Sequence, residues 1–368
     1  MTTRVALFLP SLNSGGAQRV MLNLLRFLLD RKVRTDLVVA NIHGPYRSQI
    51  PSGARVVHLK GNSVVRGIPS LVGYLRNERP TALLSALPHA NIAALLARRI
   101  ANCSTRILVS EHNSLTVALR HKALKKPQDR LKPVLIRWCY PSADMIVAVS
   151  QGVAQDLKLF LGLPDSRIKV IYNPIVTPEI TKNASQPVSH PWLIQPDSPV
   201  ILGVGRLTRQ KDFPTLLRAF AQVRSLVPAK LIILGEGPGR DALRALAYSL
   251  GINDDLDMPG FVQNPYAFMR RASVVALSSA WEGFGNILVE AMAVGTPVVS
   301  TDCPNGPREI LCDGVYGPLV PVGDANALAQ ATLRALRDPA DPALLRRRSE
   351  TFAAYRVAEE YLKLLLDD

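Results

Sequence analysis

Two glutamates, Glu282 and Glu290, are separated by seven residues in the segment WEGFGNILVEAMAVG. The apolar run NILVEAMAV is typical of a helix, and Gly295 is its expected end. Glu282 then precedes the helix, while Glu290 lies just over one turn inside it, where helical side chains lean toward the N-terminus. The mouth of this helix is formed by Gly283, Phe284, Gly285 and Asn286.

This segment has the chemistry to hold one ligand from two ends. Carboxylates accept hydrogen bonds from pairs of hydroxyl groups, which sugars and ribose offer. The amides at a helix N-terminus favour anions such as phosphate. The spacing therefore predicts that both carboxylates reach a ligand whose phosphates lie at the helix mouth. The alternative is that Glu290 only caps a neighbouring loop.

A second segment, VILGVGRLTRQKDF, places Arg206 and Lys211 after a predicted buried strand and before a helix that begins near Phe213. Two cations beside a strand end suit a diphosphate, which arginine binds through its planar fork and lysine as a point charge. A solvated loop is the alternative. The nearby GVG and GEGPG glycines lack the full G-x-G-x-x-G spacing, so no nicotinamide cofactor is expected.

Two weaker signals lie in the first half of the chain. Gly15 and Gly16 follow the first apolar run and open directly into a helical pattern, so their amides can approach an anion. A tight turn without a ligand explains them equally well. Glu111 and His112 stand at the end of the run RILVS. His112 is either a structural hydrogen-bonding group or part of a site at a strand end.

Continuous apolar, β-branched runs alternate with helical patterns along the chain, as buried parallel strands should. The predicted strands are 5–9, 36–40, 54–59, 81–87, 106–110, 145–150, 199–205, 229–235, 273–279 and 296–301.

These strands predict two α/β domains with doubly wound parallel sheets, residues 1–174 and 199–351. Residues 175–198, rich in Pro, Asn and Ser, are the expected linker. The amphipathic segment 352–368 is expected to form a helix that packs back onto the first domain. Ligands bind beyond the carboxyl ends of parallel strands, so two facing sheets should enclose an interdomain cleft lined by loops from both.

The positive charge is concentrated in one half. The net charge is +15, and residues 1–180 hold 25 of the 44 Lys and Arg residues but only 9 of the 29 Asp and Glu residues. The densest segment, RHKALKKPQDRLKPVLIRW, interleaves cations with Leu, Val, Ile and Trp and predicts contact with an anionic membrane. A solvated face and nucleic-acid binding are the alternatives, although the confinement of charge to one half disfavours nucleic acid. The patch comprises Arg120, Lys122, Lys125, Lys126, Arg130, Lys132 and Arg137.

The cysteines and the hydropathy pattern point to a cytoplasmic protein. The four cysteines are scattered without metal-ligand spacing and indicate a reduced set. The N-terminal apolar run is too short for a secretory signal, and no run approaches the roughly 18 apolar residues of a membrane span. We therefore expect a cytoplasmic protein that is peripheral on a membrane surface.

Several motifs together resemble one family. LNSGGAQRV, SEH, ADMIVAVSQGVAQDL, VIYNP, GRLTRQKD, LGEGPGRDAL, GFVQNP and the E-x7-E block occur in the order seen in retaining glycosyltransferases of family 4, which have the GT-B fold. The resemblance runs nearly end to end, and its most specific motif is the E-x7-E block. It implies that the catalytic residues are Glu282, Lys211, Arg206 and His112. It implies that the donor-binding residues are Gly15, Gly16, Val262, Gly283, Phe284, Gly285, Asn286, Ile287 and Glu290.

The resemblance also implies a mechanism and a class of substrate. In this family the leaving diphosphate accepts the acceptor's proton, so neither cofactor nor metal is expected, and we interpret the D-x-D at Asp255–Asp257 as a coincidence. LNSGGAQRV, SEHNS and TDCPNGPREIL resemble bacterial enzymes that build polyprenyl-diphosphate-linked glycans, lipopolysaccharide or capsule from UDP-sugars. A GDP-sugar donor, a soluble acceptor and a nucleotide-sugar epimerase of the same fold remain the alternatives.

Overall fold

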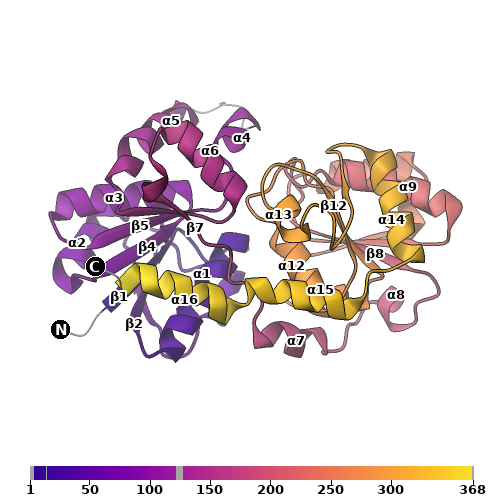
Figure 1. Ribbon diagram of the computed structural model, residues 1–368, viewed down its shortest axis with the longest axis horizontal. Helices are drawn as coiled ribbons and strands as arrows, with labels where there is room; N and C mark the ends of the chain where they lie inside the picture. The colour runs from indigo at the N-terminus through magenta and orange to yellow at the C-terminus, as the bar shows by residue number, and fades with distance from the viewer. Residues whose placement is uncertain (1–3, 14, 122–126, 367–368) are drawn as a thin grey trace. The chain divides into compact units, whose positions relative to one another are not determined.

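The computed structural model describes residues 4–13, 15–121 and 127–366. The chain divides into two compact units, and each is described by itself (Figure 1). Unit 1 comprises Met1–Ile175 and Ala354–Asp368, and unit 2 comprises Val176–Ala353. The last helix of the chain therefore belongs to the same unit as the first strand.

Unit 1 is built on a seven-stranded sheet with the order β3-β2-β1-β4-β5-β6-β7, in which all pairings are parallel. Such an order requires crossovers on both faces. The strands are β1 (Arg4–Leu9), β2 (Arg34–Val39), β3 (Arg55–His58), β4 (Ala82–Ala86), β5 (Arg106–Glu111), β6 (Met145–Ala148) and β7 (Ile168–Val170). The helices are α1 (Gly16–Asp30), α2 (Ile68–Glu78), α3 (Pro88–Ala101), α4 (Leu115–His121), α5 (Pro127–Cys139), α6 (Gln151–Leu161) and α16 (Ala354–Leu366), with short 3-10 turns at η1 (Pro45–Gln49), η2 (Tyr140–Ser142) and η3 (Asp165–Arg167).

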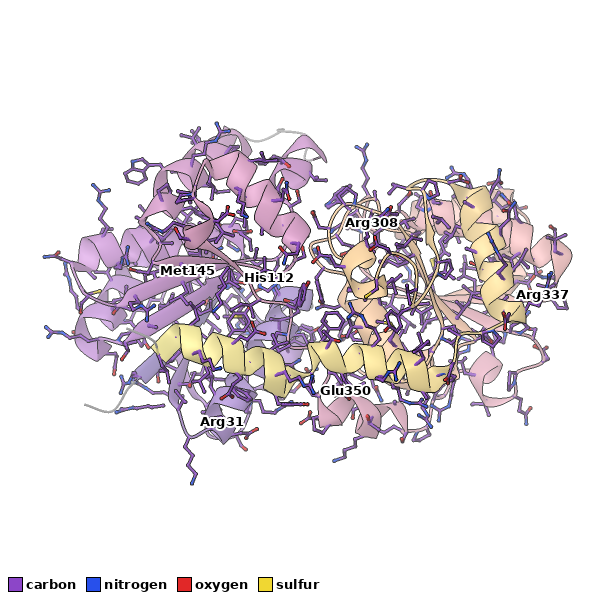
Figure 2. The ribbon with its side chains drawn as sticks, viewed as in Figure 1. Arg31, His112, Met145, Arg308, Arg337 and Glu350 are labelled. Carbon is purple, nitrogen blue, oxygen red and sulfur yellow. The ribbon has the colours of Figure 1, made fainter. Side chains whose placement is uncertain are left out.

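The core of unit 1 joins the two ends of the chain. Alternate residues of β1, including Leu7, pack in one cluster with α1 and with the buried Tyr361 of α16. Helices α1 and α16 lie side by side, and an ion pair joins Arg31 to Glu359 at 2.8 Å (Figures 1 and 2). The apolar face of α16 is therefore what brings residues 354–366 onto the first unit.

Unit 2 repeats this architecture with a six-stranded parallel sheet in the order β10-β9-β8-β11-β12-β13. Its strands are β8 (Val200–Val204), β9 (Lys230–Leu234), β10 (Leu256–Gly260), β11 (Val274–Leu277), β12 (Val298–Thr301) and β13 (Leu319–Val320). Its helices are α7 (Pro178–Ala184), α8 (Pro191–Ile194), α9 (Phe213–Leu226), α10 (Arg240–Ser249), α11 (Pro265–Arg271), α12 (Asn286–Ala293), α13 (Pro307–Leu311), α14 (Ala325–Arg337) and α15 (Pro342–Ser349), with 3-10 turns η4 (Asn253–Asp255) and η5 (Glu350–Phe352).

The segment expected to be a linker is a folded part of unit 2, apart from its first residue. Helix α7 packs against α11, and Ile180 and Leu193 are buried. Its prolines, which suggested a linker, instead begin short helices: Pro178 and Pro191 stand at the first helical positions, where a proline loses no hydrogen bond.

The parallel sheets bring the predicted residues to one edge in each unit. All strands of a parallel sheet end at the same edge, so the loops after β1 and β5 gather at one edge of unit 1. The loops after β8, β10, β11 and β12 gather at one edge of unit 2. Three strands, β7, β10 and β13, were not predicted. They lie at the sheet edges, where β7 has three residues and β13 has two.

Candidate active site

The turn after β11 holds the strongest polar contact among the predicted residues. Lys211 Nζ lies 2.5 Å from Glu282 Oε1, and Ser279 Oγ donates to the same oxygen at 2.6 Å. Only 17% of the Lys211 side chain and 8% of the Glu282 side chain are exposed. Because neither charge is well solvated, each needs the other in this position. Sequence reasoning named both residues but did not pair them.

Lys211 is positioned by the loop that follows β8. Strands β8 and β11 are neighbours, so the loops at their ends touch. The Ala280 amide donates to the Gln210 carbonyl at 2.8 Å, and Ser278 Oγ donates to the Lys211 carbonyl at 2.8 Å. The Lys211 side chain runs close over Gly205, where a Cβ would lie 3.0 Å from its Cε. These contacts fix the direction in which the ammonium group points.

The loop after β12 supports the same turn from the other side. The Glu282 amide donates to the Pro304 carbonyl at 3.2 Å, and Asn305 Nδ2 donates to the Glu282 carbonyl at 3.4 Å. Gly306 has φ +91, and a Cβ there would overlap the carbonyl of Phe284. Sequence reasoning missed Asn305 and Gly306, although their segment, CPNGP, was part of the family resemblance.

The base of this supporting loop is held by an arginine. Arg308 of α13, labelled in Figure 2, donates to Asp302 Oδ1 at 3.2 Å and to Asp313 Oδ1 at 3.0 Å. The arginine therefore ties the start of the loop to the turn that follows α13. The backbone of residues 304–306, which lies between these anchored positions, contacts the Glu282 turn.

Helix α12 begins where the sequence predicted. Gly285 is its N-cap, with φ +102, a conformation that glycine adopts without strain. Glu290 is buried on this helix, one turn after Asn286, so both lie on the same face. Ile287 is half-buried in the first turn. The helix mouth and Glu282 therefore lie on the same short segment.

Two further predicted donor residues lie at the same edge of unit 2. Arg206 is exposed directly after β8, five residues before Lys211. Val262 is half-buried in the loop after β10, which is the edge strand of the sheet. The structure thus gathers Arg206, Lys211, Glu282 and α12 at the central strands and leaves Val262 at the margin.

The carboxylate at the end of β5 in unit 1 is buried, and it forms no ion pair with any residue that the structure describes. Glu111 Oε1 accepts from Asn91 Nδ2 at 2.9 Å and from the Tyr140 hydroxyl. Burial raises the pKa of Glu111 to about 7, against the lowering effect of these two hydrogen bonds. Asn91 and Tyr140 were not predicted, because α3 and η2 lie 20 and 29 residues away along the chain.

His112 follows directly and is labelled in Figure 2. Its Nε2 lies 3.1 Å from Ser110 Oγ, and burial lowers the pKa of the imidazole to about 4. The ring is therefore neutral at pH 7. A neutral imidazole can exchange hydrogen bonds with a hydroxyl group but does not supply positive charge.

The predicted glycine turn lies two strands from His112. Gly15 is the N-cap of α1, directly after the loop that follows β1, and β4 separates β1 from β5 in the sheet. Gly15 is half-buried and Gly16 is exposed. Both glycines are therefore at the same edge of unit 1 as His112.

Most of the predicted basic patch lies outside the described residues. This holds for Lys122, Lys125 and Lys126, and for the side chains of Arg120 and Arg130. The described members are on α5. Lys132 is half-buried, and Arg137 is exposed, with its Nε donating to the Phe160 carbonyl at 3.2 Å.

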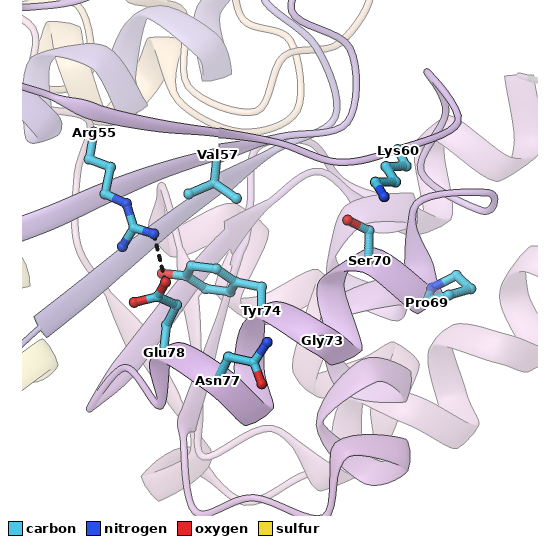
Figure 3. Close-up of a pocket in the computed structure, with 9 residues that line it drawn as sticks. All are labelled: Arg55, Val57, Lys60, Pro69, Ser70, Gly73, Tyr74, Asn77 and Glu78. Carbon is cyan, nitrogen blue, oxygen red and sulfur yellow. Dashed lines mark hydrogen bonds and ion pairs between the residues drawn. The ribbon is translucent and has the colours of Figure 1, made fainter.

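Neither a cavity in unit 1 nor the D-x-D motif in unit 2 belongs to the predicted site. A cavity of about 430 Å³ lies between β3 and α2, with the Arg55–Glu78 ion pair in its wall, and it contains none of the predicted site residues (Figure 3). Of the D-x-D carboxylates, Asp255 ends η4 and Asp257 lies near the start of β10. Asp255 contacts Arg224 and Lys230, and Asp257 contacts His190 at 2.9 Å.

The described residues contain neither a metal-binding cluster nor a membrane-spanning helix. No group of three or more His, Cys, Asp or Glu side chains in the described part of the chain is arranged to hold a metal ion. No helix over the same residues is long and apolar enough to cross a membrane.

The chain is similar to known glycosyltransferases along nearly its whole length. A relative from Campylobacter jejuni, N-acetylgalactosamine-N,N'-diacetylbacillosaminyl-diphospho-undecaprenol 4-alpha-N-acetylgalactosaminyltransferase, is 29% identical over 99% of both chains. The lipopolysaccharide core biosynthesis glycosyltransferase LpsE of Rhizobium meliloti is 28% identical, over 95% of this chain and 96% of its own. The solved structure of Anabaena Alr3699/HepE in complex with UDP and glucose superposes with a TM-score of 0.79 at 19% identity, over 99% of both chains.

Two family models divide the chain much as the two units do. The model described as Glycosyltransferase Family 4 matches residues 14–178, and the one described as Glycosyl transferases group 1 matches residues 187–352. Together they span most of the chain, with the paired Lys211 and Glu282 in the second match and His112 in the first. The chain belongs to the family 4 glycosyltransferases, enzymes of the GT-B fold.

Proposed function

We propose that this glycosyltransferase moves a hexose or N-acetylhexosamine from a UDP-sugar to a lipid-linked or growing surface-glycan acceptor, with retention of configuration and without a metal. The observation that carries the proposal is the buried Lys211–Glu282 pair beside the mouth of α12. It supplies a cation for a diphosphate and a carboxylate for sugar hydroxyls within one turn.

The residues take distinct roles in this reaction. The acceptor oxygen forms a bond to the anomeric carbon while the bond from that carbon to the diphosphate oxygen breaks, and the acceptor proton passes to the leaving diphosphate. Lys211, Arg206 and the α12 amides stabilise the negative charge that develops there. Glu282 holds the sugar hydroxyls, Glu290 binds the ribose, and the main chain near Val262 meets the base.

Residues of unit 1 also take roles in this proposal. His112, neutral at pH 7, would lie beside the transferred sugar, and Gly15 and Gly16 would face the donor phosphates. This assignment follows the family resemblance and the location of all three residues at one sheet edge. The acceptor would also meet this unit.

The choice of substrates rests on the relatives. The Campylobacter jejuni relative is named for transfer to a diphospho-undecaprenol-linked sugar, and the Anabaena structure contains UDP and glucose. A lipid-diphosphate acceptor would place this enzyme on the cytoplasmic face of the inner membrane, where the positive residues of unit 1 favour an anionic surface. A GDP-sugar donor or a soluble acceptor is the competing assignment.

A donor screen tests the substrates directly. Purified enzyme is given UDP- and GDP-sugars with a polyprenyl-diphosphate-linked acceptor, with and without EDTA. We expect turnover with a UDP-sugar that EDTA leaves unchanged. Turnover only with GDP-sugars, a requirement for divalent metal, or epimerisation of the donor without transfer would each contradict the corresponding part of the proposal.

Substitutions test the site. Lys211→Ala and Glu282→Ala should each lower kcat by about a thousandfold, because the leaving group loses its cation or the sugar loses its carboxylate. Lys230→Ala is the matched control, since this lysine is also ion-paired in unit 2, at 2.7 Å from Asp255, but at the start of β9. The site assignment is wrong if either site variant keeps near wild-type turnover while remaining folded by circular dichroism.

A further inference from the structure

Helix α5 exposes a continuous apolar face. Leu131, Val134, Leu135 and Trp138 are 59%, 63%, 38% and 56% exposed. Their spacing of three, four and seven positions puts them on one side of a helix. We call these four residues the α5 stripe. On another side of the same helix Ile136 and Cys139 are buried, so α5 already has a face that packs on unit 1.

The α5 stripe differs from the other exposed apolar residues of the protein. Within the described residues, no other helix exposes more than two large apolar side chains. Leu226 on α9 and Tyr248 on α10, for example, are exposed singly. Scattered exposure of this kind is ordinary, whereas a contiguous patch marks an interaction surface.

Cations border the stripe. Lys132 follows Leu131 and Arg137 precedes Trp138, and a helical step of about 100° puts one on each flank of the stripe. The guanidinium carbon of Arg99, on α3, lies 5.3 Å from the centre of the Trp138 ring. Leucine and tryptophan between lysines and arginines is the composition of a helix that lies in a membrane interface.

The charge decides between two possible occupants. A second copy of this chain would bring two equally positive faces together, since residues 1–180 carry 25 Lys and Arg against 9 Asp and Glu. An anionic lipid surface would instead attract the flanking cations and accept the apolar side chains between them.

We propose that α5 lies in the interface of an anionic membrane with the α5 stripe inserted among the lipids. This proposal rests on the proposed function in one respect: a lipid-linked acceptor is the reason for the enzyme to meet a membrane. The inserted part is the apolar stripe, and the cations on its flanks contact headgroups. Lys132 and Arg137, the described members of the sequence-predicted patch, then add attraction without being the inserted element.

Vesicle binding tests the insertion. The double variant L131S/W138S should bind vesicles of phosphatidylglycerol and phosphatidylcholine at least about tenfold more weakly than wild type, which corresponds to about 1.4 kcal/mol. The matched control L226S/Y248S removes two apolar side chains from unit 2 that are even more exposed, and it should bind like wild type. Equal binding by the two double variants would overturn the proposal.

Fluorescence separates insertion from surface attraction. Of the three tryptophans, Trp138 is the one whose side chain is more than half exposed. Acyl chains that carry bromine should quench its emission in bound wild type, and W138F should keep the binding but lose most of the quenching. Binding without any quenching would show attraction to headgroups alone and would overturn insertion.

Two further measurements distinguish the alternatives. A concentration-dependent dimer that L131S/W138S abolishes, in a protein that binds no vesicles, would assign the stripe to a second copy and overturn the proposal. Turnover of the donor with a short water-soluble acceptor should be unchanged in L131S/W138S. If wild type binds and inserts but transfers no sugar to any acceptor, the proposed function fails while the membrane inference stands.

Discussion

The two units each bury a glutamate at the carboxyl edge of a parallel sheet, and the two carboxylates have different partners. Glu282 of unit 2 faces the ammonium group of Lys211. Glu111 of unit 1 faces the neutral Asn91 amide and Tyr140 phenol, and burial raises its pKa to about 7. Both carboxylates are buried, but Glu282 lies beside a cation, whereas the described groups that bond to Glu111 are neutral.

This difference suits the two halves of a transfer reaction. A paired cation and carboxylate at the unit 2 edge can meet a ligand that carries both phosphates and hydroxyls. The unit 1 edge, with a neutral His112 and a Glu111 that titrates near neutrality, presents hydrogen bonds without a fixed charge. Uncharged hydroxyl groups need hydrogen bonds of this kind.

After Lys211→Ala and Glu282→Ala, the largest effect is expected at the loop that supports the unit 2 turn. In Gly306→Ala a Cβ would overlap the Phe284 carbonyl, so the 282–285 turn must move. We expect kcat to fall by more than about a hundredfold and the free energy of unfolding to fall by about 3 kcal/mol. Transfer assays and urea unfolding measure the two effects.

Gly323→Ala is the matched control for this change. Gly323 also has positive φ, +79, but a Cβ there would meet nothing within 4 Å. It should cost about 1 kcal/mol from backbone strain and leave kcat unchanged. Equal losses in the two variants would mean that backbone conformation, and not contact with the Glu282 turn, explains the need for glycine.

A smaller effect, with a distinct pH dependence, is expected in unit 1. The pKa of Glu111 is about 7 in the folded protein against 4.5 for the unperturbed group. Between these values the folded state keeps a proton that the unfolded state releases, so this group's contribution to stability falls as pH rises. Relative to Glu111→Gln, wild type should lose roughly 3 kcal/mol of unfolding free energy from pH 4.5 to 7.

Urea unfolding at several pH values measures this difference, and the contribution of His112 cancels because both proteins contain it. Tyr140→Phe provides a second variant. It removes a hydrogen bond that lowers the Glu111 pKa, so the pH window should move upward. Parallel stability curves for wild type and Glu111→Gln would contradict this prediction, because they would show that the Glu111 carboxyl does not titrate in this range.

The smallest effect is expected at an ion pair of unit 2 outside the site. Burial favours the neutral form of Asp255, but hydrogen bonds from Lys230 and Arg224 outweigh it and lower the pKa. Asp255→Asn should cost about 1 kcal/mol of stability and leave transfer unchanged, with or without added divalent cation. A loss of metal-dependent turnover in this variant would instead make the D-x-D part of the catalytic site.

Sequence patterns predicted all the central strands and, of the four edge strands, only β3. Runs such as 5–9 and 106–110 are continuously apolar because both faces of a central parallel strand are covered. The short edge strands β7 and β13 have too few residues to show that pattern. The segment 176–198 was mistaken for a linker because prolines that begin helices have the same composition as prolines in a coil.

The site residues also fall into two groups, those that local sequence patterns predict and those that only contacts with distant segments explain. Glu282, Glu290, Lys211 and Arg206 could be found because strand-turn-helix segments place them by local spacing alone. Asn305, Gly306, Asn91 and Tyr140 could not, since each acts through a contact with a different strand-end loop or helix. For Asn91 and Tyr140, nothing in their immediate neighbours distinguishes them from ordinary core residues.

By itself, the sequence determined which residues stand at strand ends and where helix α12 begins, because hydrophobic periodicity and glycine caps act over a few residues. Only the tertiary structure decided that Lys211 meets Glu282, that Glu111 bonds to Asn91 and Tyr140, and that the α5 stripe is exposed. The physical reason is that charge state and exposure depend on every element packed around a side chain. Those neighbours come from distant parts of the chain.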